Sequence, residues 1–209
     1  MREIVRAQYK KMVKAFEQIN YKNKEIVLLG DSIINYLDET KYFSNTNIIN
    51  MGIPGDDTIG VLKRLNQVIK IKPKIIIVSI GSNDIPKIND GVDNIVKRIL
   101  KIKYELIENL PDAEIHILSL LPVLDDKSIT NYNYLKNRTN DIIDKINEEL
   151  LIFSKIIDVN GCLKDNDNNL RKDYTYDGLH LNEKGYIPFS RELSQNIKGL
   201  VLKKEFKNE

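Results

Sequence analysis

Five short apolar runs rich in β-branched residues recur along the chain and predict five buried strands. None of them alternates apolar with polar residues, as a strand with one solvent-facing side would do. They span Ile26–Leu29, Ile48–Met51, Ile75–Ile80, Ile115–Leu120 and Ile156–Val159. The intervals between them are too long for hairpins, so we expect parallel pairing through crossover connections.

Segments with apolar residues at helical spacing lie between these runs. The repeats cover residues 59–69, 92–110 and 135–150, and further helices are expected over about Glu3–Ile19 and Ile187–Leu202. Alternating strands and helices imply a parallel sheet with right-handed crossovers and helices on both faces. No stretch rich in Pro, Gly and Ser divides the 209 residues. We therefore predict an α/β fold, a three-layer α/β/α sandwich in one domain over residues 1–209.

Polar motifs follow the first three predicted strands, at the edge where open α/β sheets bind ligands. Gly30–Ser32 follows the first strand, Asn50–Gly52 ends the second, and Gly81–Asp84 follows the third. A fourth motif, Asp177–His180, comes late in the chain. Parallel strands bring their carboxyl ends together, so the first three motifs are expected to converge.

Ser32 and His180 are candidates for nucleophile and general base. The chain has two histidines, and the other, His116, lies inside a predicted strand. Asp177, three residues before His180, can place a carboxylate on Nδ1 and leave Nε2 for the serine proton. Ser32 would also suit a helix N-cap, and an Asp-x-x-His sequence is often an exposed turn. The nucleophile elbow G-x-S-x-G is not satisfied, because Ile34 occupies the position of its second glycine.

Gly52 and Asn83 are candidate oxyanion donors together with the Ser32 N–H. A residue without Cβ lets its N–H approach a developing oxyanion closely, and the Asn83 amide is a side-chain donor. Each also has a structural interpretation. Gly52 suits the end of a strand, Gly55 suits a turn before the next helix, and Asn83 with Pro86 makes an acceptable turn.

The amino-acid composition indicates a globular domain and argues against a membrane protein. An apolar share of 42% with 30% charged residues is ordinary for a globular domain, and the single Cys162 forms no internal disulfide. A charged N-terminus, Met1–Arg6, argues against a secretory signal, so a cytoplasmic location is expected. The longest apolar run, Ile75–Ile80, is far shorter than the ~20 residues of a membrane span. We expect no integral membrane association.

Charge carries little information about partners. The net charge of +2 is the remainder of 32 basic and 30 acidic residues spread along the chain, which does not favour nucleic-acid binding. The basic C-terminal stretch Lys203–Lys207 is expected to be a solvated, fraying end. Nothing in the pattern predicts the number of subunits.

The order Ser32, Gly52, Asn83, His180 resembles the four blocks of the SGNH hydrolases, also called the GDSL family. The block Asp177–Tyr186 is similar to the family's last motif. The resemblance implies a flavodoxin-like five-stranded sheet and hydrolysis of carboxylic esters through an acyl-enzyme. It implies Ser32 as nucleophile, His180 as base, Asp177 as its orienting carboxylate, and no metal or organic cofactor.

Two positions depart from the family pattern. Ile33 replaces the leucine of the family's name, and Pro188 falls where the last helix should be established, at its first position or at a kink. Neither would displace His180. Asp31 and Asp84 adjoin the candidate residues and are expected to support them.

The expected partner is a small ester, and the preferred one is an O-acylated carbohydrate with a short, acetyl-type acyl group. The stretch Asn50–Leu65 is similar to the branch of bacterial platelet-activating-factor-acetylhydrolase-like esterases and carbohydrate O-deacetylases. The loop Leu121–Tyr134 is a candidate for specificity, and its Tyr132 and Tyr134 would stack on a sugar or pack against a helix.

Three alternatives stay open. The first is an acylhydrolase of the lysophospholipase or thioesterase type, and the second is a catalytically silent ligand-binding module. The third is a metal-dependent phosphoesterase with Asp31, Asp84, Asp177 and His180 as ligands, because carboxylates are plentiful at the same strand ends.

Overall fold

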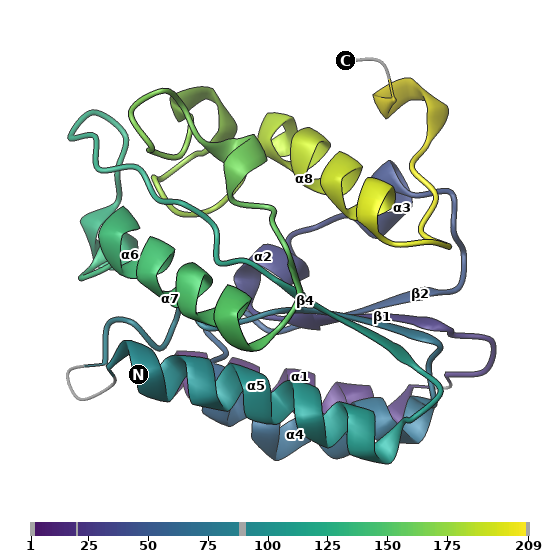
Figure 1. The fold of residues 1–209 in the computed structure, drawn as a ribbon. Coiled ribbons are helices and arrows are strands. Elements are labelled where there is room, and N and C mark those ends of the chain that lie inside the picture. Colours follow the sequence, from purple (N-terminus) through teal and green to yellow (C-terminus); the bar gives the residue numbers. More distant parts are fainter. Residues whose placement is uncertain (1–2, 20, 88–90, 208–209) are drawn as a thin grey trace.

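Each of the five β-branched runs forms a strand, and every pairing between them is parallel. The computed structural model describes residues 3–19, 21–87 and 91–207. Its strands are β1 (Ile26–Gly30), β2 (Ile48–Gly52), β3 (Ile75–Ser79), β4 (Glu114–Leu118) and β5 (Ile156–Ile157). They lie in the order β2-β1-β3-β4-β5, the flavodoxin-like order (Figure 1). The predicted fold class and sheet are confirmed.

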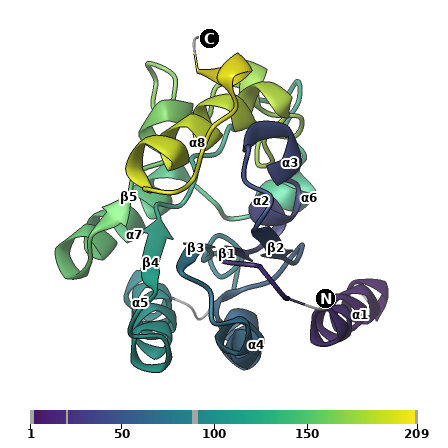
Figure 2. The same cartoon turned by 90° about the vertical axis from the view of Figure 1, so that its right-hand side faces the viewer.

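Helices cover both faces of this sheet. They are α1 (Glu3–Gln18), α2 (Ser32–Asn35), α3 (Glu39–Tyr42), α4 (Thr58–Ile71), α5 (Val92–Asn109), α6 (Tyr132–Leu135), α7 (Asn140–Phe153) and α8 (Glu183–Asn196). Figures 1 and 2 show α1, α4 and α5 on one side and α2, α3 and α8 on the other. The three predicted layers are therefore present.

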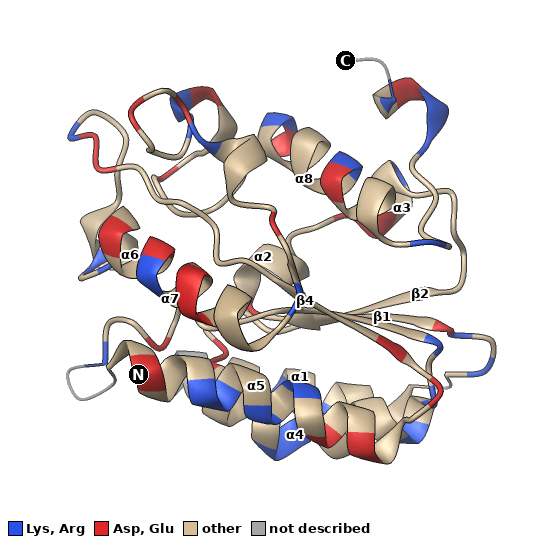
Figure 3. Ribbon diagram, viewed as in Figure 1, with Lys and Arg blue, Asp and Glu red and all other residues tan. Residues whose placement is uncertain are grey.

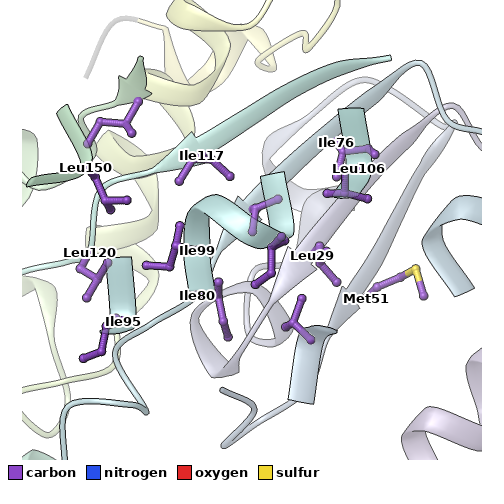
Figure 4. Close-up of a cluster of buried hydrophobic side chains, with 14 of the residues drawn as sticks. Leu29, Met51, Ile76, Ile80, Ile95, Ile99, Leu106, Ile117, Leu120 and Leu150 are labelled. Atoms are coloured by element: carbon purple, nitrogen blue, oxygen red, sulfur yellow. The ribbon is translucent and has the colours of Figure 1, made fainter. Parts of the chain in front are cut away.

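The sheet separates two apolar cores, as expected for strands buried on both faces. One core packs side chains of α4, α5 and α7 on residues such as Leu29, Ile76 and Ile117 (Figure 4). The other packs α2 and α8 on the opposite face, around Leu28 and Ile77. Neighbouring strand residues thus face opposite cores, which explains why the runs show no polar alternation.

Two of the predicted helices differ in their bounds. The expected helix over residues 135–150 is divided, because Leu135 ends the short α6 and α7 begins only at Asn140. The last helix begins at Glu183, with Asn182 as its N-cap, so Pro188 lies inside it and not at its first position. Its first turn is polar, so the apolar pattern did not mark its start.

The C-terminal stretch is packed through Lys207, so the expectation of a fraying end is wrong. Residues Lys204–Phe206 form a 3₁₀ turn. The Phe206 ring lies 5.1 Å from the Tyr42 ring, and its carbonyl accepts a hydrogen bond from Arg191 at 2.9 Å. The aromatic residue, which the basic residues around it obscure in the sequence, anchors this segment.

Charges of both signs share the outer helices. Lys or Arg and Asp or Glu occur together on α5 and α7 (Figure 3). Within the described ranges, no helix is long and apolar enough to cross a membrane.

Candidate active site

The carboxyl ends of the first three strands lie level with one another. Gly30 at the end of β1 pairs in register with Gly52 of β2 and Ser79 of β3. Ser32 opens α2 directly after β1. The N-cap of this short helix is Asp31, whose carboxylate accepts from the Ile33 N–H at 2.9 Å, so the N-cap interpretation of Ser32 is wrong. The Ser32 hydroxyl is free for another role.

A continuous series of hydrogen bonds joins Ser32 to the late motif. The His180 Nε2 lies 3.0 Å from the Ser32 Oγ, and its Nδ1 lies 2.7 Å from the Asp177 Oδ2. A carboxylate on Nδ1 favours the tautomer in which Nε2 accepts a proton from the hydroxyl. Burial would raise the pKa of Asp177, but hydrogen bonds from the ring and backbone of His180 lower it below its ordinary value. Asp177 therefore stays ionised against the imidazole.

The loop that carries Asp177 and His180 is fixed by its own polar groups. The second oxygen of Asp177 accepts from the backbone N–H of His180 at 2.8 Å. The buried Thr175 hydroxyl donates to the His180 carbonyl at 2.7 Å and accepts from the Gly178 N–H at 3.0 Å. Gly178 has φ +83°, and a Cβ there would lie 2.4 Å from the Leu124 carbonyl. Glycine is thus required by both conformation and space.

Two tyrosines flank the imidazole. The rings of Tyr36 and Tyr134 each lie 5.4 Å from His180 in edge-on geometry. Both rings, with Tyr176, line a cavity of about 410 Å³ that includes His180 and Asp177. Tyr132, the other tyrosine singled out in the sequence, instead donates to Asp125 at 2.5 Å.

Asn83 lies near the candidate nucleophile, with hydrogen bonds at both ends of its amide. Its Nδ2 donates to the Asp56 carbonyl at 2.9 Å and lies 3.5 Å from the Asp31 Oδ2. Its Oδ1 accepts from Arg138 at 2.8 Å. The NH₂ group thus binds the Asp56 carbonyl closely and reaches the Asp31 carboxylate only at the limit of hydrogen-bond distance.

Gly52 does not fit the role of oxyanion donor. Its N–H donates to the Asn50 side chain at 3.0 Å, and a Cβ there would meet the Asn35 backbone nitrogen at 2.3 Å. Gly52 therefore permits close packing of β2 against α2. Gly55 stands further along the same loop, exposed and with φ +79°. Among the described residues, the Gly55 N–H has no hydrogen-bond acceptor. The next residue is Asp56, whose carbonyl accepts a hydrogen bond from the Asn83 amide.

The two supporting carboxylates have different surroundings. Asp31 is buried, and its burial raises its pKa to about 6 against the lowering effects of the Ile33 N–H and the charge of Arg138. Asp84 accepts from the Thr58 N–H and hydroxyl at 3.0 and 2.6 Å, so it joins the start of α4 to the Asn83 turn. In the part of the chain that the structure describes, no three His, Cys, Asp or Glu side chains are grouped to hold a metal ion.

His116 lies away from this edge. It is in β4, in register with Ile77 in the middle of β3, and its Nε2 lies 3.5 Å from Glu114. The expectation that it could not reach a substrate at the strand ends agrees with this position. The sequence did not single out Arg138 or Thr175, because one buried arginine and one threonine in loops carry no spacing signal.

Three comparisons place the chain among known proteins. The sequence profile of the GDSL-like lipase/acylhydrolase family matches residues 28–186. Platelet-activating factor acetylhydrolase IB subunit alpha1 of Rattus norvegicus is 28% identical over 180 residues, covering 82% of this chain and 74% of that protein.

Solved structures agree in fold. A Streptococcus pneumonia protein named after platelet activating factor is 28% identical, with a TM-score of 0.82 over 91% of this chain and 93% of that one. An acetyl xylan esterase shares the fold at 18% identity, with a TM-score of 0.60 over 83% of this chain and 100% of that one.

Proposed function

The chain belongs to the GDSL-like lipase/acylhydrolase family and is a hydrolase of esters, and we propose that Ser32, His180 and Asp177 carry its reaction. The observation that supports this assignment is the hydrogen-bonded series from Asp177 through His180 to Ser32, at 2.7 and 3.0 Å. Residues from the end of β1 and from a loop late in the chain meet in the geometry that a serine nucleophile requires.

The first half of the reaction forms an acyl-enzyme. The Ser32 Oγ attacks the ester carbonyl carbon, and its proton passes to the His180 Nε2. The tetrahedral intermediate collapses, the bond to the alcohol oxygen breaks, and His180 gives its proton to that oxygen. Asp177 keeps the imidazole in the required tautomer and stabilises its charged form.

Water completes the cycle. It attacks the acyl carbon while His180 takes one of its protons, and the Ser32 oxygen leaves and receives that proton. The carboxylic acid is released and the hydroxyl is restored.

The oxyanion is bound by three donors in this proposal. They are the N–H of Ser32, which has no acceptor in the first turn of α2, the N–H of Gly55, and the amide of Asn83. Gly55 replaces Gly52, whose N–H is already bonded to Asn50. Removing one donor of this kind costs roughly 10²- to 10³-fold in turnover.

The proposed substrate is a short-chain ester of a carbohydrate. His180 must deliver its proton to the leaving oxygen, so the alcohol lies on the His180 side, where the cavity opens. Tyr36 and Tyr134 expose 51% and 50% of their surfaces there, which suits stacking against the apolar face of a sugar. The names of two similar proteins, an acetylhydrolase and an acetyl xylan esterase, support an acetyl group.

Labelling by a fluorophosphonate probe tests the nucleophile and the carboxylate that orients the base. We expect the wild type to be labelled, Ser32→Ala not to be labelled, and Asp177→Asn to be labelled at least ~10²-fold more slowly. Asp173→Asn is the matched control, because this exposed carboxylate of the same segment pairs with Arg171. Labelling that persists in Ser32→Ala contradicts the assignment, and an unlabelled wild type favours a silent binding module.

A series of p-nitrophenyl esters tests the acyl group. The highest kcat/KM is expected for acetate or butyrate, with acetylated sugars as competitors. A maximum at long chains would favour an acylhydrolase of the lysophospholipase or thioesterase type.

A further inference from the structure

A buried arginine stands behind the amide of Asn83. Arg138 lies between α6 and α7 and is 5% exposed. Among the residues that the structure describes it forms no ion pair, although Asp31 and Asp84 are near enough to favour its charge. Burial of a charge without a contacting carboxylate is costly unless every donor finds an oxygen. The acceptors of the Arg138 hydrogen bonds therefore indicate the role of this buried charge.

The guanidinium of Arg138 directs its donors to one turn and one helix. Its Nη2 donates to the Asn83 Oδ1 at 2.8 Å. Its Nε lies 2.9 Å from both the carbonyl and the hydroxyl of Ser82, the residue before Asn83. Its Nη1 donates to the Tyr134 carbonyl at 2.6 Å.

These contacts determine which end of the Asn83 amide faces the nucleophile. A guanidinium can only donate hydrogen bonds, so it binds the amide only when Oδ1 points toward it. The Asp56 carbonyl can only accept, so it requires Nδ2 on the other side. If the amide were rotated by half a turn, a carbonyl oxygen would face the developing oxyanion and repel it.

We infer that Arg138 is a positioning residue, which orients the Asn83 amide so that its NH₂ group donates to the ester oxyanion. This inference rests on the proposed function. The same guanidinium polarises the amide it binds, which strengthens the N–H as a donor in a buried site. It also joins the Asn83 turn to α6, whose Tyr134 lies edge-on to His180.

A double-mutant cycle separates this role from a general effect on folding. Arg138→Met removes the donors and keeps much of the volume, and Asn83→Ala removes the amide. With p-nitrophenyl acetate, we expect Arg138→Met to lower kcat by roughly 10- to 10²-fold while KM changes by less than about threefold. In the Asn83→Ala background, the same change should lower kcat by less than about threefold, because the amide it orients is gone.

Two further variants complete the experiment. Arg138→Lys keeps a cation and one donor group, so it should recover part of the lost kcat. Ile146→Val, in the buried face of α7, lowers stability without contacting the site and should leave kcat unchanged. If Arg138→Met does not fold, Arg138→Lys is compared with wild type in both backgrounds.

The outcomes are distinct. An equal fold loss in both backgrounds, or an unchanged kcat in Arg138→Met, overturns the inference. Failure of the proposed function appears separately, as a wild type that the fluorophosphonate probe does not label.

Discussion

At the scale of single residues, Asp31 combines a structural and an electrostatic constraint next to the proposed nucleophile, Ser32. It caps α2 through the Ile33 N–H and faces the Asn83 amide. It is 3% exposed, and burial raises its pKa to about 6. Relative to the unfolded chain, the fold therefore stabilises the neutral form of Asp31, which still ionises above about pH 6.

The raised pKa of Asp31 predicts a pH-dependent difference between the wild type and Asp31→Asn. Below the unfolded pKa of about 4, Asp31 is protonated in both the folded and the unfolded state, and its contribution to stability is complete. This contribution is lost as pH rises from about 4 through the folded pKa of about 6, because unfolding then releases a proton. Between about pH 4 and pH 7, the wild type should lose on the order of 3 kcal/mol relative to Asp31→Asn, whose side-chain oxygen keeps the cap.

Urea unfolding at several pH values measures this difference. Comparing the two proteins at each pH removes the contributions of titratable groups that both retain and that do not interact with Asp31. A difference in the free energy of unfolding that stays constant over this pH range would contradict the raised pKa of Asp31.

Some residues of the candidate site could be predicted from the sequence and others could not. Ser32, Asp177 and His180 could be singled out because a scarce residue type and strand ends restrict the choice. Gly52 was predicted as an oxyanion donor, and the bond from its N–H to the Asn50 side chain could not be foreseen, because the direction of a side chain is not set by spacing. Arg138 was missed because an arginine between two helices is usually solvated, and only tertiary packing buries it.

At the scale of elements, the short segment between η2 (Lys172–Tyr174) and α8 brings His180 to the site. The Asn182 side chain forms hydrogen bonds to both α8 and η2. Its Oδ1 accepts from the Gly185 N–H at 3.1 Å as the N-cap of α8, and its Nδ2 donates to the Asp173 carbonyl at 2.9 Å. One amide therefore links the start of α8 to the segment that carries His180.

Replacing Asn182 should separate its two contributions. Asn182→Ala is expected to lower the free energy of unfolding by about 1–2 kcal/mol, because the cap and the loop contact are both lost. Asn182→Ser keeps an acceptor for the Gly185 N–H and should be about 0.5–1 kcal/mol more stable than the alanine variant. Urea unfolding measures both, and equal stability of the two variants would show that the cap contributes nothing.

Strands and helices could be predicted from the sequence where burial alone determines their position. The five strands could be located because runs buried on both faces are rich in β-branched residues and mostly apolar. The start of α8 could not, since its first turn is polar and is fixed by the side chain of Asn182. The division between α6 and α7 was hidden in the same way, because the apolar repeat runs from Leu135, the last residue of α6, across the Thr139 cap into α7.

At the scale of the whole molecule, α3 and the C-terminal segment meet beneath the cavity, in the core around Leu28 and Ile77. Tyr42, at the end of α3, lines the cavity and is 2% exposed. Its hydroxyl donates to the Glu183 carbonyl at 3.1 Å, and its ring packs against Phe206 near the C-terminus. The C-terminal segment thus supports one wall of the site from behind.

Removing this support should affect stability more than chemistry. Phe206→Ala is expected to lower the free energy of unfolding by about 1–3 kcal/mol, less than for a fully buried ring, and to lower Tm by several degrees. The kcat on a small ester should stay within about twofold, because Ser32 and His180 keep their contacts. Val201→Ala, at a 48% exposed position in the same segment, is the control and should change stability by less than about 0.5 kcal/mol. A stability of Phe206→Ala equal to that of the control would contradict the anchoring role of the ring.

The bond between the His180 Nε2 and the Ser32 Oγ joins residues 148 positions apart in the chain. We expect a contact of such long sequence separation to form late in folding, because the entropy of loop closure is lost before the contact contributes. The reactivity of Ser32 during refolding should accordingly develop later than helix content. Covalent labelling of one hydroxyl would then report when the last long-range contacts of the molecule have formed.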